Sequence, residues 1–289
     1  DTVIRQKIHS LSISDQKDNE VAAKRFRQNL FGLHHPYGKI LKAEDLQKIK
    51  REDLLDFYEK NLFTEPVIVV CGKVDEEVLD QLGTTFGQLN VSHNEQEEGK
   101  IIPLEQHRVL ERPESVQSAI RMGHLSINKH HPDIHKLHIT TSLLGGYFGS
   151  RLMDNIREDK GYTYGISANI AHLHDASFFI ISTNVVKQYT SNTVDEILKE
   201  INLLQTELVP QKELDTVKNY LRGKFLSGLD TAFNIAGKFN AVMLHGLDYE
   251  YYNKFLAELD SITPEVIMDI ARKYYDTDNM RSVIVGEKQ

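Results

Sequence analysis

The sequence predicts an α+β fold made of duplicated units, each an antiparallel β-sheet flanked by helices. Two alternating apolar runs, at about 164–172 and 178–186, are joined by a short turn, which indicates antiparallel pairing. The pattern from Thr190 to Tyr275 is almost entirely helical, and strands grouped apart from helices are typical of α+β folds. Residues near the start also recur near the end at a spacing of 213.

The repeat defines the expected domains. Its matches run in order: Ala23 with Ala236, Phe26 with Phe239, Leu30 with Met243, Leu46 with Leu259, Ile49 with Ile262, and Lys60 with Lys273. Residues 91–100 hold one apolar residue and are typical of a connection. We therefore expect residues 1–92 to be the C-terminal part of a first unit, 93–104 a linker, and 105–289 a complete second unit. On this spacing the front of unit one, about 110 residues, would precede Asp1.

The elements before the hairpin follow from caps and apolar spacing. Residues 67–70 predict an apolar strand, in which Cys71 would be a buried, unreactive thiol. Asp75 can cap a helix that runs to about Leu89. Pro132 suits the first turn of a helix, and the apolar face continues into a second helix past Gly149.

The later elements follow from alternation and breaks. Residues 164, 166, 168, 170 and 172 are expected on one side of a strand, with a turn at His174 and Asp175 before the returning strand. The helical region that follows has breaks near Pro210, 228–231 and 246–248.

Composition excludes several classes of function. The formal net charge is −8 and the pI near 5.9, with no Lys/Arg-rich run, so we expect neither nucleic-acid nor membrane partners. One cysteine excludes an intrachain disulfide and a cysteine-only zinc site. No apolar run reaches the roughly 18 residues of a membrane span. The expectation is a soluble protein, cytoplasmic or periplasmic, with the compartment left open.

Two motifs argue for structure rather than chemistry. His131, His135 and His138 could share a helix face, but Ile134 stands where the inverted zinc motif His-x-x-Glu-His needs its Glu, so we expect solvated histidines and no metal ligands. The run LLGGYFGS at 143–150 lacks the Lys-Ser/Thr of a phosphate loop, which favours close backbone packing.

The segment IREDKGYTYG at 156–165 is the candidate site. A helix ends in charged residues, Gly161 permits a left-handed turn, and a strand leaves at once. Arg157 and Tyr164 flank this reversal, so their side chains could converge and donate hydrogen bonds to a peptide carbonyl or a developing oxyanion. A purely structural role for both stays open, since Arg suits a helix C-terminus and Tyr suits a strand.

Three segments carry a family resemblance. They are LFGLHHPYGK at 30–39, the strand-Gly-Lys-Val-Asp junction at 69–75, and GGYFGSRLMDNIREDKGYTYGI at 145–166. With them the chain resembles the pitrilysin/insulinase family of inverzincin metallopeptidases, including the processing-peptidase type. The resemblance implies two α+β halves around a chamber for unfolded peptides, with zinc in the first half. It also implies that Arg157 and Tyr164 act together, as catalytic and substrate-binding residues, on the scissile carbonyl.

The sequence departs from the family at the third zinc ligand. Residues 1–19 contain no Glu where the family places one, and the stretch IRQKIHSLSIS at 4–14 resembles zinc-less subunits of heterodimeric members. We therefore expect no cofactor in this chain, with zinc in a partner subunit or in a preceding segment.

The leading hypothesis is a zinc-less subunit of a peptidase, active with a zinc-bearing homologue, that donates Arg157 and Tyr164. Its partners would be that homologue, or a second copy in a homodimer, and peptide or unfolded polypeptide substrates. One alternative is a self-sufficient zinc endopeptidase whose motif precedes Asp1. Another is a peptide-binding or scaffold subunit without enzymatic activity, so whether the chain is itself an enzyme stays open.

Overall fold

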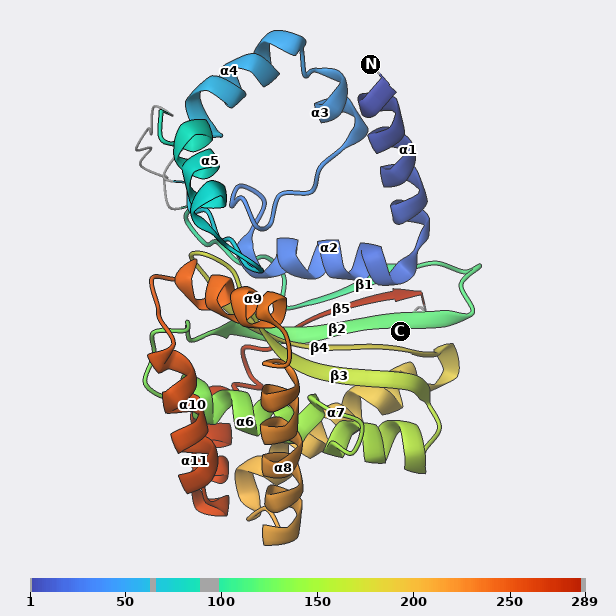
Figure 1. The fold of residues 1–289 in the computed structure, drawn as a ribbon. Coiled ribbons are helices and arrows are strands. Elements are labelled where there is room, and N and C mark those ends of the chain that lie inside the picture. Colours follow the sequence, from blue (N-terminus) through green and yellow to red (C-terminus); the bar gives the residue numbers. More distant parts are fainter. Residues whose placement is uncertain (1, 63–65, 89–98, 287–289) are drawn as a thin grey trace.

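A five-stranded sheet is the centre of the molecule (Figure 1). The computed structural model describes residues 2–62, 66–88 and 99–286. The strand order is β1-β5-β2-β4-β3. The strands are β1 (His107–Glu111), β2 (Gln117–Ser126), β3 (Thr163–His172), β4 (Ser177–Val186) and β5 (Arg281–Gly286). The β3–β4 hairpin with its turn at His174 and Asp175 is confirmed. The α+β class is also confirmed, although β1 runs parallel to β5 and makes the sheet mixed.

One face of the sheet is covered by α2 (Asp18–Phe31). Ala22, Phe26 and Leu30 are fully buried there against apolar side chains of β2, β4 and β5. The His-Pro-Tyr-Gly turn follows this helix, and the Tyr37 hydroxyl lies 3.1 Å from Asp175 Oδ2 in the hairpin turn. The sequence pattern Phe-x-x-x-Leu of α2 is therefore an apolar stripe that faces the sheet.

The other face is covered by helices from the second half of the chain. They are α6 (Ile134–Gly145), the π-helix η1 (Met153–Asp159), α7 (Thr190–Thr206), α8 (Gln211–Ser227), α9 (Ala232–Met243), α10 (Glu250–Ser261) and α11 (Pro264–Tyr274), with the short 3₁₀ turn η2 (Lys187–Tyr189) before α7. The three expected breaks between helices are confirmed, and a further short interruption separates α10 from α11. The main core lies between these helices and the sheet, so β2, β4 and β5 are apolar on both faces.

Helix α6 begins later than the sequence suggested. Its first residue is Ile134, two positions after Pro132, and the helix ends at Gly145 before a separate helical segment starts. The backbone around Pro132 forms a turn instead, closed by the Ile134 amide on the carbonyl of His131 at 3.0 Å.

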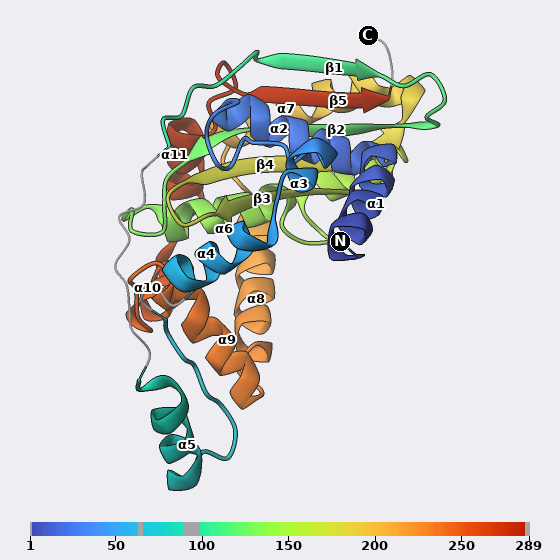
Figure 2. The ribbon, with the colours of Figure 1, turned by 90° about the horizontal axis from the view of Figure 1, so that it is seen from above.

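The described residues of the first part of the chain contribute four further helices, which lie on the same side of the sheet as α2 (Figure 1). They are α1 (Thr2–Gln16), α3 (Ala43–Gln47), α4 (Arg51–Asn61) and α5 (Glu76–Phe86). Asp75 caps α5 as expected, since its Oδ1 accepts from the Val78 amide at 3.1 Å. Figure 2 shows α5 projecting away from the sheet. No residue of α1, α4 or α5 is fully buried.

The expected strand at 67–70 does not form. These residues have no regular secondary structure and are exposed, and Cys71 is half-buried rather than enclosed. A strand requires a hydrogen-bonding neighbour, and within the described residues none lies beside this segment. The prediction was wrong because an apolar run indicates a preference for strand but cannot supply its partner.

One pair of helices has the 213-residue spacing of the expected repeat. Arg51–Asn61 (α4) shifted by that spacing coincides with Pro264–Tyr274 (α11). The first half of the expected linker, 93–98, lies outside the described residues. In the described part of the chain, no helix combines the length and the apolar character needed to cross a bilayer.

Candidate functional site

Arg157 lies on a π-helix. η1 spans seven residues, and the Lys160 amide donates to the Asn155 carbonyl five residues earlier at 3.1 Å. The wider turn is anchored by Ile156, which is fully buried in the main core. π-helices are rare and occur frequently at functional sites, because the additional residue redirects a side chain.

Gly161 reverses the chain as the sequence predicted. Its φ is +66°, in the left-handed region. The Gly161 amide donates to the Arg157 carbonyl at 3.1 Å, and the Tyr162 amide donates to the Ile156 carbonyl at 3.0 Å. Tyr162 then stacks on Tyr189 with ring centroids 4.3 Å apart, which fixes the start of β3.

A β-bulge turns Tyr164 outward. Thr163 pairs with Val185 but Ile166 pairs with Thr183, so the register shifts between Thr163 and Ile166. The Gly165 amide donates to Thr163 Oγ1 at 3.1 Å and stabilises the bulge. Tyr164 is therefore 90% exposed, whereas Ile166 and Ala168 are buried. We expected residues 164, 166, 168, 170 and 172 on one side of the strand. This prediction was wrong at Tyr164, because a bulge interrupts the two-residue period.

The side chains of Arg157 and Tyr164 do converge. The guanidinium carbon of Arg157 lies 5.5 Å from the Tyr164 ring centroid and 4.5 Å from that of Phe148. Only 24% of the Arg157 side chain is exposed, and its Nη1 donates to Glu158 Oε1 at 2.7 Å. Two aromatic rings and one carboxylate thus orient a cation beside an exposed phenol.

Phe148 is the residue that sequence reasoning missed. It belongs to the glycine-rich run, whose expected close packing is confirmed: a Cβ on Gly145 would lie 2.6 Å from the Ala168 backbone nitrogen. A hollow of about 370 Å³ adjoins this run and is lined by residues including Tyr147, Phe148 and Met153. The available signal in the sequence was an aromatic residue between the glycines.

Polar contacts hold the π-helix against α7 and α8. The Arg151 guanidinium makes a bidentate pair with Glu213, at 2.8 and 3.0 Å. Asn155 Nδ2 donates to Glu196 and Glu200 at 2.9 and 2.6 Å. The hydrogen bond from Asn155 lowers the pKa of Glu196. These contacts hold the helical segment that carries Arg157 in a fixed position.

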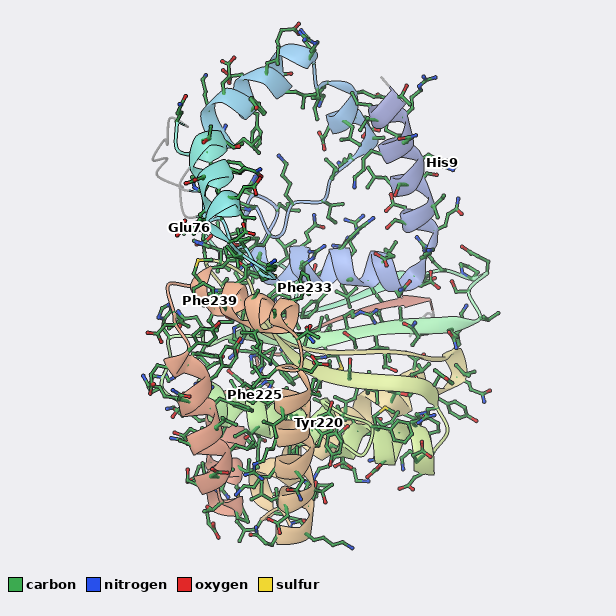
Figure 3. The ribbon with its side chains drawn as sticks, in the orientation of Figure 1. His9, Glu76, Tyr220, Phe225, Phe233 and Phe239 are labelled. Carbon is green, nitrogen blue, oxygen red and sulfur yellow. The ribbon has the colours of Figure 1, made fainter. Side chains whose placement is uncertain are left out.

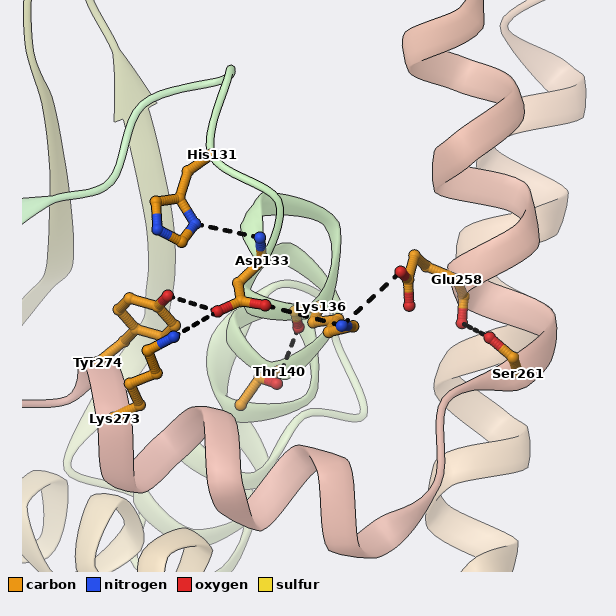
Figure 4. A network of polar contacts seen from close by, with 8 residues as sticks. All are labelled: His131, Asp133, Lys136, Thr140, Glu258, Ser261, Lys273 and Tyr274. Atoms are coloured by element: carbon orange, nitrogen blue, oxygen red, sulfur yellow. Dashed lines mark hydrogen bonds and ion pairs between the residues drawn. The ribbon is translucent and has the colours of Figure 1, made fainter.

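The three histidines near α6 do not form a metal site. His131 packs against Tyr274, and its Nδ1 accepts from the Asp133 amide at 3.1 Å (Figure 4). His135 is buried against Tyr251, so the expectation that it is solvated was wrong. Among the described residues, no three His, Cys, Asp or Glu side chains are grouped to hold a metal ion.

Asp133 organises the polar network beside these histidines (Figure 4). Its Oδ2 accepts from Lys273 Nζ at 2.7 Å and from the Tyr274 hydroxyl at 2.6 Å. The hydrogen bond from Lys273, followed by that from Tyr274, lowers the pKa of Asp133 to about 2. This network joins the start of α6 to the end of α11 and is structural.

Comparison with known proteins gives a consistent result. Residues 48–221 match the family described as "Peptidase M16 inactive domain". The "uncharacterized zinc protease YmxG" of Bacillus subtilis is 21% identical over 261 residues, which cover 88% of this chain and 62% of that protein. The "non-peptidase homolog YmxG" of Helicobacter pylori is 25% identical over 268 residues, 85% of this chain and 58% of the relative.

A solved structure agrees in fold. The M16 inactive domain from Pseudomonas fluorescens has a TM-score of 0.88 at 22% identity, over 100% of this chain and 70% of that one. The present chain spans about three fifths of the length of the two curated relatives.

Proposed function

Because this chain belongs to the family of the peptidase M16 inactive domain, we propose that it is the zinc-less subunit of an M16 peptidase and donates Arg157 and Tyr164 to the peptide. The family match agrees with the resemblance drawn from the motifs. The observation that carries the proposal is the exposed Tyr164 phenol beside the oriented Arg157 guanidinium.

The pair has the donors that a peptide carbonyl requires. A guanidinium offers several N–H groups in a fixed plane, and a phenol offers one O–H. Both would donate to the carbonyl oxygen and more strongly to the oxyanion that forms when the carbonyl is attacked. Arg157 Nη1 now donates to Glu158, so the incoming oxygen would take the remaining N–H groups or exchange with that carboxylate.

The neighbouring sheet edge suits an extended peptide. β3 is the last strand in the sheet order, and Tyr164 lies near its first residue. A peptide that adds to this edge gains main-chain hydrogen bonds and brings a carbonyl toward the Arg/Tyr pair. The hollow beside Phe148 would accept a neighbouring apolar side chain.

The described residues do not fit a zinc site. Zinc needs at least three grouped ligands, and residues 2–62, 66–88 and 99–286 contain no such group. We therefore assign to this chain only the binding and orientation of the carbonyl. Zinc would belong to a homologous partner subunit.

The proposed role of Arg157 and Tyr164 is tested by a peptide hydrolysis assay. The full-length protein is mixed with the zinc-bearing homologue from the same organism. Arg157→Ala should lower turnover by about 100-fold, and Arg157→Lys should recover only part, because an ammonium lacks the planar fork. Arg222→Ala is the matched control, since this arginine lies on α8 and pairs with Asp260. Unchanged turnover in Arg157→Ala would remove the proposed role.

The same preparation separates the alternatives. About one tightly held zinc per full-length chain, with hydrolysis in the absence of a partner, would favour the self-sufficient peptidase. Peptide binding that persists in the Arg157→Ala/Tyr164→Phe double variant, with hydrolysis unaffected, would favour the scaffold.

A further inference from the structure

A large basic hollow lies at the opposite edge of the sheet from Arg157. It has a volume of about 950 Å³ and lies between α1, α2, the segment 39–45 and β1. The described basic side chains that line it are Lys24, Arg25, Lys39, Lys42, Arg108 and Arg112, against three acidic ones. This excess of positive charge contrasts with the net charge of −8 for the chain.

Two of these cations are already used by the fold. Arg112 Nη1 lies 3.1 Å from Asp18 Oδ1, and its Nη2 donates to the Asp15 carbonyl at 2.7 Å. Lys24 Nζ lies 2.8 Å from Asp15 Oδ1. These contacts join α1, α2 and β1, and they leave the Asp15 carboxylate engaged with Lys24.

Arg25 and Arg108 are differently placed. Arg25 Nη1 donates to the uncharged amide of Gln28 at 3.0 Å, and within the described residues no carboxylate forms an ion pair with it. Arg108 contacts Glu105 only through Nε, at 3.2 Å. Burial, followed by the charge of Arg108, lowers the pKa of Arg25. Two half-buried guanidinium groups therefore face one space without a shared anion.

Apolar side chains also line the hollow. Val21, Leu33, Ile40 and Leu104 contribute to the walls. A free inorganic anion would satisfy the guanidinium groups but leave this surface and most of the volume unused. A nucleic acid would need a basic surface that continues beyond the hollow, and the sequence has no Lys/Arg-rich run.

We propose that this hollow binds an extended acidic peptide segment, with a Glu or Asp carboxylate between Arg25 and Arg108 and apolar side chains against Leu33 and Leu104. Carboxylates match guanidinium geometry and form charge-assisted hydrogen bonds. The site is independent of the Arg/Tyr pair, because β1 and β3 form opposite edges of the sheet.

Fluorescence anisotropy with labelled peptides tests this. The probe is a peptide of alternating Glu and Leu, and the matched peptide carries Gln for Glu. We expect the Glu peptide to bind the full-length protein at least about tenfold more tightly, with affinity falling as salt rises. Equal binding of the two peptides would overturn the proposal.

Variants locate the binding. Arg25→Gln and Arg108→Gln should each weaken the Glu peptide by about tenfold, which is the size of a lost charge-assisted contact. Arg51→Gln, an exposed arginine on α4, is the control and should bind normally. Thermal melts of each variant check folding, and a folded Arg25→Gln protein with unchanged affinity would refute the site. If inorganic phosphate at millimolar concentration fully displaces the Glu peptide, the hollow is a site for small anions and the peptide proposal is overturned.

Discussion

At the scale of single residues, the Arg157 and Tyr164 pair could be found from the sequence but its geometry could not. The glycine at 161 predicts the reversal, and the reversal brings the two residues together. The bulge between Thr163 and Ile166 has no such signature, because it depends on pairing with β4. Phe148 was missed for a related reason, since its contact with Arg157 forms only after α6 packs on β3.

Phe148 should orient Arg157 without stabilising the fold. Its side chain is 64% exposed, so Phe148→Ala should change the free energy of unfolding by less than about 1 kcal/mol. Loss of the ring removes a cation–π contact, and we expect peptide turnover by the assembled enzyme to fall several-fold. Phe233→Ala is the control, because this residue is 71% exposed on α9 (Figure 3). Equal turnover in the two variants would contradict the role of Phe148.

His135 should make stability depend on pH. Burial, followed by the charges of His138 and Lys254, lowers the pKa of His135 to about 4. The unfolded chain binds a proton near pH 6.5 but the folded chain does not, so stability falls as pH drops from 6.5 toward 4, by up to about 1.4 kcal/mol per pH unit. His172, whose pKa burial also lowers to about 4, acts in the same direction. Asp133, with a pKa of about 2, contributes constant stability above pH 5.

Urea unfolding at pH 7 and pH 5 measures this dependence. His135→Phe keeps an aromatic ring against Tyr251 and removes the titrating group, so the variant should lose less stability between the two pH values than the native protein. His130→Phe, at an exposed loop position, should retain the native dependence. If the free energy of unfolding changed equally with pH in all three proteins, His135 would be excluded as the source of the pH dependence.

At the scale of elements, helices were predicted better than strands. Asp75, Pro210 and the glycines near 228 and 246 mark helix ends by local chemistry, and the structure places the ends there. The run at 67–70 has the composition of a strand but no pairing neighbour among the described residues. The parallel pair of β1 and β5 could not be predicted either, because some 170 residues separate the two strands.

At Gly145, the end of α6 packs closely on β3. Because an added Cβ would meet the Ala168 backbone nitrogen at 2.6 Å, Gly145→Ala should destabilise the protein by about 1–3 kcal/mol. Gly237→Ala on α9 is the matched helical control. Outside its own helix backbone and chain neighbours, no described atom lies within 4 Å of the new Cβ, so helix propensity should stabilise the protein slightly. Urea midpoints compare the two, and similar values would contradict close packing at Gly145.

At the scale of the whole molecule, the repeat relates two helices with different surroundings. We propose that residues 1–92 and 105–289 belong to two related units, in which α2 and α9 are counterparts. Phe26 on α2 is fully buried against the sheet. Its counterpart Phe239 lies on α9 (Figure 3), where the nearby Ile235 and Leu244 are exposed. If the two units are related by symmetry, α9 should pack on a sheet of the first unit, in the same way that α2 packs on the five-stranded sheet described above.

Matched truncations measure this asymmetry. In the 289-residue chain, Phe26→Ala should cost about 3–5 kcal/mol, since it opens a cavity beneath α2, and Phe239→Ala only about 1 kcal/mol. If a sheet covers α9 in the full-length protein, the cost of Phe239→Ala should rise there toward that of Phe26→Ala. Urea unfolding of the 289-residue chain and of the full-length protein gives the cost of each truncation in each protein. A Phe239→Ala cost that stays near 1 kcal/mol in the full-length protein would mean that α9 remains uncovered and that the two units are not packed symmetrically.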